Sequence, residues 1–373
     1  MAHKAERGIF ELRQGRVLCV KDVSPETSSV VAPVEGLGAA SLAQLHALGG
    51  PLCLVVTSHR GRAMGLQPHD TADLALALDG TETPDVILAL AAGGVQPSAA
   101  RPAGATTPAS RAESAGLSLA RLGGLLPAVI AARVPSDHPL LAKWMQDATV
   151  LEVAAEEVEQ AVASSPIEVT NVAGAPVPLA VAEDARLVFF REGGGLLEHV
   201  AVLIGPRESW PDPVPVRLHS ACLTGDLFGS MRCDCGEQLR GSLAHMKNRG
   251  GGVLVYLAQE GRGIGLGNKI RAYTLQEAGL DTIDADEVLG FGDDERRYGA
   301  AVGILRHLAI ERVELLTNNP QKVRALEEAG IQVVERTPIY GGINRHNLRY
   351  VQAKVHRSGH WLMDMIAQRA PAD

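Results

Sequence analysis

A chain of 373 residues is long enough to form two or three domains that each bury a hydrophobic core. Its formal net charge of -8 argues against a general nucleic-acid-binding surface, because such surfaces need an excess of Lys and Arg. The charged N-terminus is followed by no apolar signal segment, and no run of about eighteen apolar residues occurs, so we expect a cytoplasmic protein without membrane spans.

Residues 11 to 133 have the pattern of an α/β domain. Apolar runs predict strands at 16–20, 51–56 and 127–132, and helical spacing predicts helices at 41–48 and 113–122. The first of these helices is expected to be capped by Ser41. A further apolar segment at 85–92 precedes a loop rich in Pro, Ala, Gly and Thr. This part of the sequence contains no metal cluster and no phosphate-binding loop.

The middle of the chain is predicted to join two domains. Residues 144 to 163 have helical spacing with many Glu residues on one side, typical of a solvated helix face. We therefore expect a first domain at 1–135, a helical linker at 136–173 and a second domain at 174–373. The second domain opens with two paired strands, at 187–191 and 199–204.

Three of the five cysteines lie within fourteen residues, as Cys222, Cys233 and Cys235. In an alternating strand, side chains two apart share a face, so Cys233 and Cys235 are predicted to converge, with Cys222 returning from a turn at 223–226. Three thiolates favour zinc, and a set of three leaves the fourth position that a catalytic zinc keeps for water. The alternatives are small buried hydrophobic residues or a disulfide, and the expected cytoplasmic location argues against the disulfide.

Polar motifs follow in the order expected of an α/β site. After a helix at 238–249, a buried strand at 252–257 runs into a glycine-rich turn at 259–267, whose amides can approach an anion. The charged loop at 290–298 is a candidate acid/base and phosphate-handling element. A strand over 313–316 ends in a polar turn, the position in an α/β sheet where ligands bind.

From about Gly174 to the C-terminus the chain resembles the GTP cyclohydrolase II family. The resemblance is carried by several separated motifs in family order: Arg217-Leu218-His219-Ser220, the three cysteines, Gln259-Glu260-Gly261-Arg262, Ile270-Arg271-Ala272-Tyr273, Asp294-Glu295-Arg296 and Leu316-Thr317-Asn318-Asn319-Pro320. It implies zinc-dependent hydrolysis of GTP to 2,5-diamino-6-(5-phospho-ribosylamino)pyrimidin-4-one, formate and pyrophosphate, the first step of riboflavin biosynthesis.

The same resemblance implies a role for each matching residue. Cys222, Cys233 and Cys235 would bind Zn2+, whose water attacks C8 of guanine, with Asp294 as proton acceptor and Tyr273 orienting substrate or water. Arg296 would attack the α-phosphorus, although an electrostatic role is an alternative because arginine is a poor nucleophile at its normal pKa. GTP contacts would come from Arg217, Leu218, His219, Ser220, Gln238, Glu260, Gly261, Arg262, Thr282, Thr317 and Lys322. Mg2+ would accompany the triphosphate, and the family implies a homodimer.

Ala221 departs from the family pattern, because many members carry Glu before the first zinc cysteine. Two alternatives to the leading interpretation stay open, and the loss of that side chain favours the first of them. One is a related zinc hydrolase that opens the ring of another nucleotide. The other is a nucleotide-binding regulator without turnover, against which the retention of Tyr273, Asp294 and Arg296 argues.

The first half resembles a shortened, degenerate 3,4-dihydroxy-2-butanone 4-phosphate synthase domain. The motifs that carry this resemblance are residues 11–17, 50–57, Arg101-Pro102 and 110–113. That family holds magnesium with an acidic run after the first strand, and the corresponding run here, residues 21–29, has lost most of its carboxylates. The family's Arg-Pro-Gly-His becomes Arg101-Pro102-Ala103-Gly104. We therefore expect an inactive structural or regulatory domain.

Overall fold

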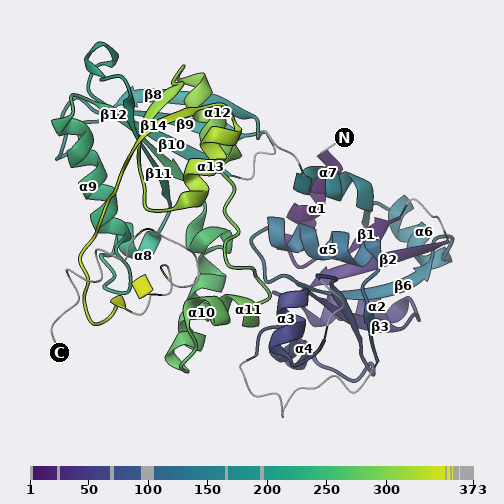
Figure 1. The fold of residues 1–373 in the computed structure, drawn as a ribbon. Helices are drawn as coiled ribbons and strands as arrows, with labels where there is room; N and C mark the ends of the chain where they lie inside the picture. The colour runs from purple at the N-terminus through teal and green to yellow at the C-terminus, as the bar shows by residue number, and fades with distance from the viewer. Residues whose placement is uncertain are drawn as a thin grey trace. The chain divides into compact units, whose positions relative to one another are not determined.

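In the computed structural model the chain forms two compact units, each containing one mixed α/β layer structure (Figure 1). The structure describes residues 3–22, 26–67, 71–93, 105–163, 167–193, 197–348, 351–352, 355 and 361. Two predictions, on residues 101–104 and on the centre of the run 21–29, lie outside these ranges. The predicted α/β fold class is confirmed. Within the described ranges, no helix combines the length and the apolar character needed to cross a membrane.

The first unit contains Met1–Ser164 and also takes in Gly267–Glu295 from the second half of the chain. Its seven-stranded sheet has the order β5-β4-β3-β6-β2-β1-β7. Neighbouring strands are antiparallel except for the parallel pair β1 and β7. The elements are α1 His3–Arg13, β1 Leu18–Lys21, β2 Thr27–Pro33, α2 Ala39–Ala47, β3 Leu52–Val56, α3 Ser58–Ala63, β4 Leu74–Ala77, α4 Pro84–Ala92, β5 Thr106–Pro108, α5 Arg111–Leu122, β6 Ala128–Pro135, α6 Pro139–Gln146, β7 Leu151–Ala154, α7 Ala155–Ala163, α10 Leu266–Glu277 and α11 Thr282–Val288.

Helix α5 is the central helix of the first unit. It packs on β1, β2, β3 and β6, and α1 and α7 pack against it. A side chain at Gly116 would place its Cβ 3.0 Å from a methyl group of Val31, so glycine allows the helix to approach the sheet this closely. A capping box from Ser110 to Glu113 begins the helix, as the Ser-x-x-Glu spacing favours.

The second unit contains Ser165–Leu266 and Arg296–Asp373. Its seven-stranded sheet has the order β14-β13-β11-β12-β10-β9-β8. The strands from β14 to β12 are parallel, and those from β12 to β8 are antiparallel. The elements are β8 Val169–Pro176, β9 Arg186–Glu192, β10 Glu198–Ile204, η1 Arg207–Ser209, β11 Val214–Ser220, α8 Leu223–Asp226, α9 Cys235–Asn248, β12 Gly252–Leu257, η2 Glu260–Gly263, α12 Gly299–His307, β13 Arg312–Leu316, α13 Pro320–Glu328 and β14 Gln332–Thr337.

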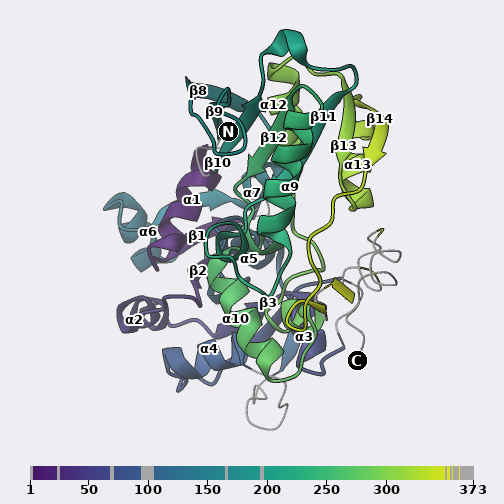
Figure 2. The same cartoon turned by 90° about the vertical axis from the view of Figure 1, so that its left-hand side faces the viewer.

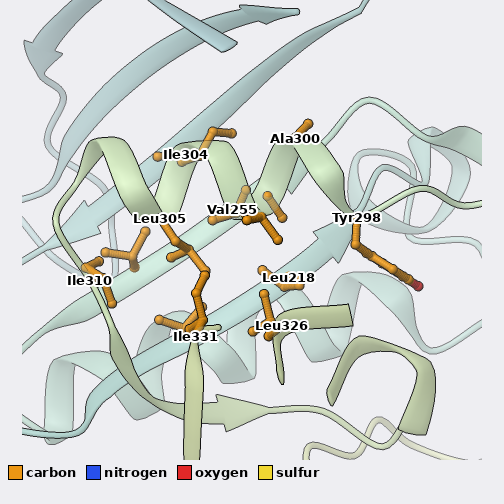
Figure 3. Close-up of a cluster of buried hydrophobic side chains, with 14 of the residues drawn as sticks. Leu218, Val255, Tyr298, Ala300, Ile304, Leu305, Ile310, Leu326 and Ile331 are labelled. Atoms are coloured by element: carbon orange, nitrogen blue, oxygen red, sulfur yellow. The ribbon is translucent and has the colours of Figure 1, made fainter. Parts of the chain in front are cut away.

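Strand β12 supplies apolar side chains to both faces of the second sheet, because successive residues of a strand point to opposite sides. Val253 and Val255 join the larger hydrophobic core, which contains side chains of α12 and α13 (Figure 3). Leu254 joins Met246 of α9 on the other face. In Figure 2, helix α9 runs lengthwise beside β11 and β12 of the second sheet. Two-sided burial explains why 252–257 is an uninterrupted apolar run.

Two expectations about the middle of the chain are corrected. Residues 144–163 do not form one helix, because α6 ends at Gln146 and Ala148 takes a left-handed φ of 54°. Leu151–Ala154 then pairs with Leu18–Lys21 as an edge strand. The proposed linker at 136–173 therefore differs from the structure, in which β7 belongs to the first sheet and β8 to the second.

The predicted cap of α2 is also corrected. Gly38, and not Ser41, occupies the N-cap position. The hydroxyl of Ser41 instead donates to the carbonyl oxygen of Gly15 at 2.7 Å.

Candidate functional site

The three cysteines converge where β11 ends and α9 begins. Cys222 is the N-cap residue of α8, Cys233 lies in the following turn, and Cys235 is the first residue of α9. Their Sγ atoms all lie within 4.8 Å of one another, and those of Cys222 and Cys233 are 3.6 Å apart. The predicted alternating strand is wrong, because the chain enters a helix directly after Asp234. The convergence itself was predicted correctly.

The cluster fits a zinc ion. Thiolates about 2.3 Å from a tetrahedral zinc lie roughly 3.8 Å apart, close to the observed sulfur separation. A Cβ on Gly225 would come within 2.7 Å of the Sγ atom of Cys233, so glycine leaves the sulfur atoms their space. The neighbouring Cys222 thiol raises the pKa of Cys233 to about 11. Thiols packed this closely need a cation before they ionise together, which a zinc ion would supply.

Asp226 connects the cysteine cluster to β11 and β12. Its carboxylate accepts hydrogen bonds from the backbone N–H of Cys222 at 3.0 Å, the hydroxyl of Tyr256 at 2.9 Å and Nε2 of His219 at 3.1 Å. The His219 and Tyr256 rings stack with centroids 5.5 Å apart. Burial lowers the pKa of His219, so the imidazole is neutral at pH 7 and its proton lies on Nε2, facing the carboxylate.

Cationic side chains line the carboxyl ends of β11 and β13. Arg217 donates through Nη1 to the carbonyl oxygen of Leu316 at 2.8 Å and through Nη2 to Oε1 of Gln238 at 2.5 Å. Burial lowers the pKa of Arg217 to about 10, which leaves it charged at neutral pH. Lys322 donates through Nζ to the carbonyl oxygen of Leu218 at 2.6 Å. The β11–β13 edge therefore holds two buried positive charges.

Several buried polar atoms at this edge have no hydrogen-bond partner among the residues that the structure describes. They are Nε of Arg217, Nδ1 of His219, Oγ of Ser220, Oδ1 of Asn318 and Nδ2 of Asn319. Buried polar groups are normally paired, because an unpaired group costs about 1–3 kcal/mol. Five such atoms on two neighbouring strand ends are typical of a site that a polar ligand completes.

The glycine-rich turn after β12 is fixed by the side chain of Glu260. The carboxylate of Glu260 accepts from the backbone N–H of Leu223 at 2.6 Å and of Gly261 at 2.9 Å. Gly261 and Arg262 both take left-handed φ values, 61° and 62°, and at Arg262 this conformation is strained because the residue has a Cβ. Leu223 follows Cys222 directly, so Glu260 joins this turn to the segment that carries the cysteines.

The predicted site residues divide between the two units. Arg217 to Ser220, Gln238, the turn at 260–262, Arg296, Thr317, Lys322 and the cysteines belong to the second unit. Tyr273 on α10, Thr282 at the start of α11 and Asp294 after α11 belong to the first. Thr317 accepts from the backbone N–H of Asn319 at 3.0 Å and shapes the turn before α13. Sequence reasoning placed all of these residues in one domain, and the structure does not.

Two residues of this network were missed by the sequence analysis. The sequence pattern predicts Asp226 only as part of a turn and Tyr256 only as part of a buried strand. The available signal was a carboxylate four residues after the first cysteine of the cluster, the spacing that brings the side chain back to the Cys222 amide. For Tyr256 the signal was one hydroxyl in an otherwise apolar run.

Comparisons with known proteins agree with this geometry. The family model described as GTP cyclohydrolase II matches residues 170–338. A GTP cyclohydrolase-2 of Azospirillum brasilense is 41% identical over 360 residues, 95% of this chain and 93% of the relative. A riboflavin biosynthesis protein RibBA of Phocaeicola vulgatus is 38% identical over 327 residues, 84% of this chain and 78% of the relative.

Among solved structures, a two-domain 3,4-dihydroxy-2-butanone 4-phosphate synthase from A. baumannii matches with a TM-score of 0.35 and 17% identity, covering 90% of this chain and 99% of that one. The sequence relatives extend across both units, and the family model covers the cysteine cluster and both strand ends of the site. The chain belongs to the GTP cyclohydrolase II family of hydrolases.

Proposed function

We propose that this protein is a GTP cyclohydrolase II that hydrolyses GTP to 2,5-diamino-6-(5-phospho-ribosylamino)pyrimidin-4-one, formate and pyrophosphate in riboflavin biosynthesis. The observation that carries the proposal is the cysteine cluster beside a strand edge with buried cations and unpartnered polar atoms. The A. brasilense relative, which bears the name GTP cyclohydrolase-2, supports the choice of substrate.

Cys222, Cys233 and Cys235 would hold the zinc ion, and Asp226 would orient Cys222 through its backbone N–H. A zinc ion held by these three thiolates would keep a coordination position for water and would lower the pKa of that water toward neutral. Mg2+ would bind oxygens of the triphosphate and needs few protein ligands. The protein's own task at this edge is to fix the nucleotide.

Arg217 and Lys322 suit the phosphates, because a charge held in a buried position needs no reorganisation when the anion binds. Arg262 would add a further cation from the glycine-rich turn. Asp294 would accept a proton, Tyr273 would orient substrate or water, and Arg296 would act at the α-phosphorus, either as a nucleophile or by charge stabilisation. Gln238, Glu260, Thr282 and Thr317 would contact the nucleotide.

The first unit is proposed to be inactive as a dihydroxybutanone-phosphate synthase. Within the described part of the chain, the cysteine cluster is the one group of metal-binding side chains found. It lies in the second unit, and soft thiolates do not suit the hard dication that sugar-phosphate chemistry requires. The family also leads us to expect a cytoplasmic homodimer, which size measurement in solution would check.

The test of the proposed function is GTP turnover by purified protein, with formate and pyrophosphate followed together, with and without a zinc chelator. We expect both products in equal amounts and the loss of formate on chelation. Zinc-loaded protein that releases neither product from GTP, but releases formate from another nucleotide, would assign the chain to a related ring-opening hydrolase. Ala221 would then be the first position to examine.

A further inference from the structure

The first unit holds the segment Gly267–Glu295, which carries three of the proposed GTP-site residues. Helix α11 packs on α3, a helix more than two hundred positions earlier in the sequence (Figure 1). A segment that contains Tyr273, Thr282 and Asp294 therefore owes its position to residues of the degenerate domain.

The end of α11 is anchored by two buried side chains around α3. Thr57 donates through Oγ1 to the carbonyl oxygen of Gly290 at 2.7 Å. Arg60 donates through Nη1 to the carbonyl oxygen of Val288 at 3.0 Å, and through Nε and Nη2 to that of Leu90 at 3.1 and 2.7 Å. Both side chains are buried, 3% and 6% exposed.

This arrangement suits the chemistry of helix ends. The last carbonyl groups of a helix have no partner within it and carry partial negative charge. Arg60 binds such carbonyls at the ends of two helices, α11 and α4, with a planar group whose donors are fixed relative to one another. It therefore holds Val288 at a defined place relative to α4.

Further contacts continue the anchoring on both sides of α11. Asn268 on α10 donates to the carbonyl oxygen of Gly124 at 3.3 Å, and Arg271 pairs with Glu35 at 3.2 Å. After α11, Glu295 pairs with Arg121 and accepts from the backbone N–H of Gly292 at 2.8 Å. The loop that contains Asp294 is thus held to the first unit at its start and at its end.

We propose that the first unit is a positioning platform for the catalytic segment, and that Thr57 and Arg60 are positioning residues for Thr282 and Asp294. This inference rests on the proposed function for its kinetic consequence, but the anchoring itself can be measured independently. The proposal gives a role to a unit that we propose to have no catalytic activity of its own. The catalytic rate falls when a supporting contact is lost and a reacting group shifts, so these contacts would affect turnover.

The experiment compares Thr57→Val with Thr83→Val in the full-length protein. Thr57 also caps α3 by accepting from the backbone N–H of Arg60, and Thr83 caps α4 by accepting from that of Val86. The two variants therefore lose the same kind of helix cap, but only Thr57→Val loses a bond to Gly290, in the chain that follows α11. Thr57→Ser keeps the hydroxyl and should restore most of the loss.

For Thr57→Val we expect kcat for GTP to fall about tenfold or more, with zinc content unchanged. Hydrogen exchange in residues 282–292 should accelerate, while exchange in β11 and β12 stays as in the unmodified protein. Arg60→Lys, which keeps the charge but reaches only one carbonyl group, should show the same pattern and serves if Thr57→Val does not fold.

The inference is overturned if Thr57→Val matches Thr83→Val in both kcat and exchange. If the unmodified protein releases no formate from GTP, the proposed function fails, and the exchange of residues 282–292 still decides whether the platform exists.

Discussion

The carboxylate of Asp226 accepts hydrogen bonds from three groups: the backbone N–H of Cys222, the imidazole of His219 and the hydroxyl of Tyr256. All three partners donate, so a charged, acceptor-only group suits the position. Asp226→Asn places an amide N–H2 group, itself a donor, opposite these three donors. The variant should bind zinc about 10–100-fold more weakly, as measured by competition with a chromogenic chelator.

Asp184→Asn is the matched control, because Asp184 lies in an exposed pair with Lys247, with side chains 42% and 47% exposed. That variant should keep the zinc affinity of the unmodified protein. Equal zinc affinity in both variants would show that Asp226 does not support the metal site.

At the scale of elements, Glu314 on β13 holds α9, the helix that begins with Cys235. Its carboxylate accepts from Nε2 of His245 at 2.9 Å, from Nε of Arg249 at 3.2 Å and from the hydroxyl of Thr337 at 2.7 Å. Burial alone would raise its pKa, but these bonds outweigh burial and hold the pKa below 4.5. Charge-assisted bonds of this kind lock a helix onto a sheet.

Glu314→Gln should lower the free energy of unfolding by about 1–3 kcal/mol at pH 7, measured by denaturant titration. Because the folded pKa is depressed, this stability is fully present above pH 4.5 and disappears as the pH falls through the folded pKa. The two proteins should therefore approach equal stability in acid. Glu198→Gln, in an exposed pair with Arg191, is the control, and a gap that persists unchanged in acid would contradict the assignment.

At the scale of the whole molecule, one chain combines a catalytic unit with a unit that we propose to be catalytically silent. Incubation with ribulose 5-phosphate and Mg2+ should give no dihydroxybutanone phosphate, because the run at 21–29 has lost most of the carboxylates that a hard dication needs. The same preparation should release formate from GTP, which proves that it is folded. Detection of dihydroxybutanone phosphate by mass spectrometry would contradict the prediction.

The sequence by itself determined the convergence of the three cysteines, the apolar strands and the family. Cys222, Cys233 and Cys235 are close in sequence, so a short loop suffices to bring them together, whatever its secondary structure. The run Gly252–Leu257 predicted a buried strand because, apart from the hydroxyl of Tyr256, its side chains are apolar, as burial on both faces of a sheet favours. These features depend on neighbours along the chain, and local pattern is sufficient to find them.

Only the tertiary structure decided the features that depend on distant partners. Leu151–Ala154 is a strand because β1 offers it a parallel edge, which helical spacing in the same region concealed. Asp226 belongs to the site because the fold brings its carboxylate within hydrogen-bond distance of the Tyr256 hydroxyl on β12. The segment 267–295 packs with the first unit, where the hydroxyl of Thr57 donates to the carbonyl oxygen of Gly290, 233 positions away. Such contacts form only when the chain packs in three dimensions, and the residues next to each partner in the sequence do not indicate the other partner.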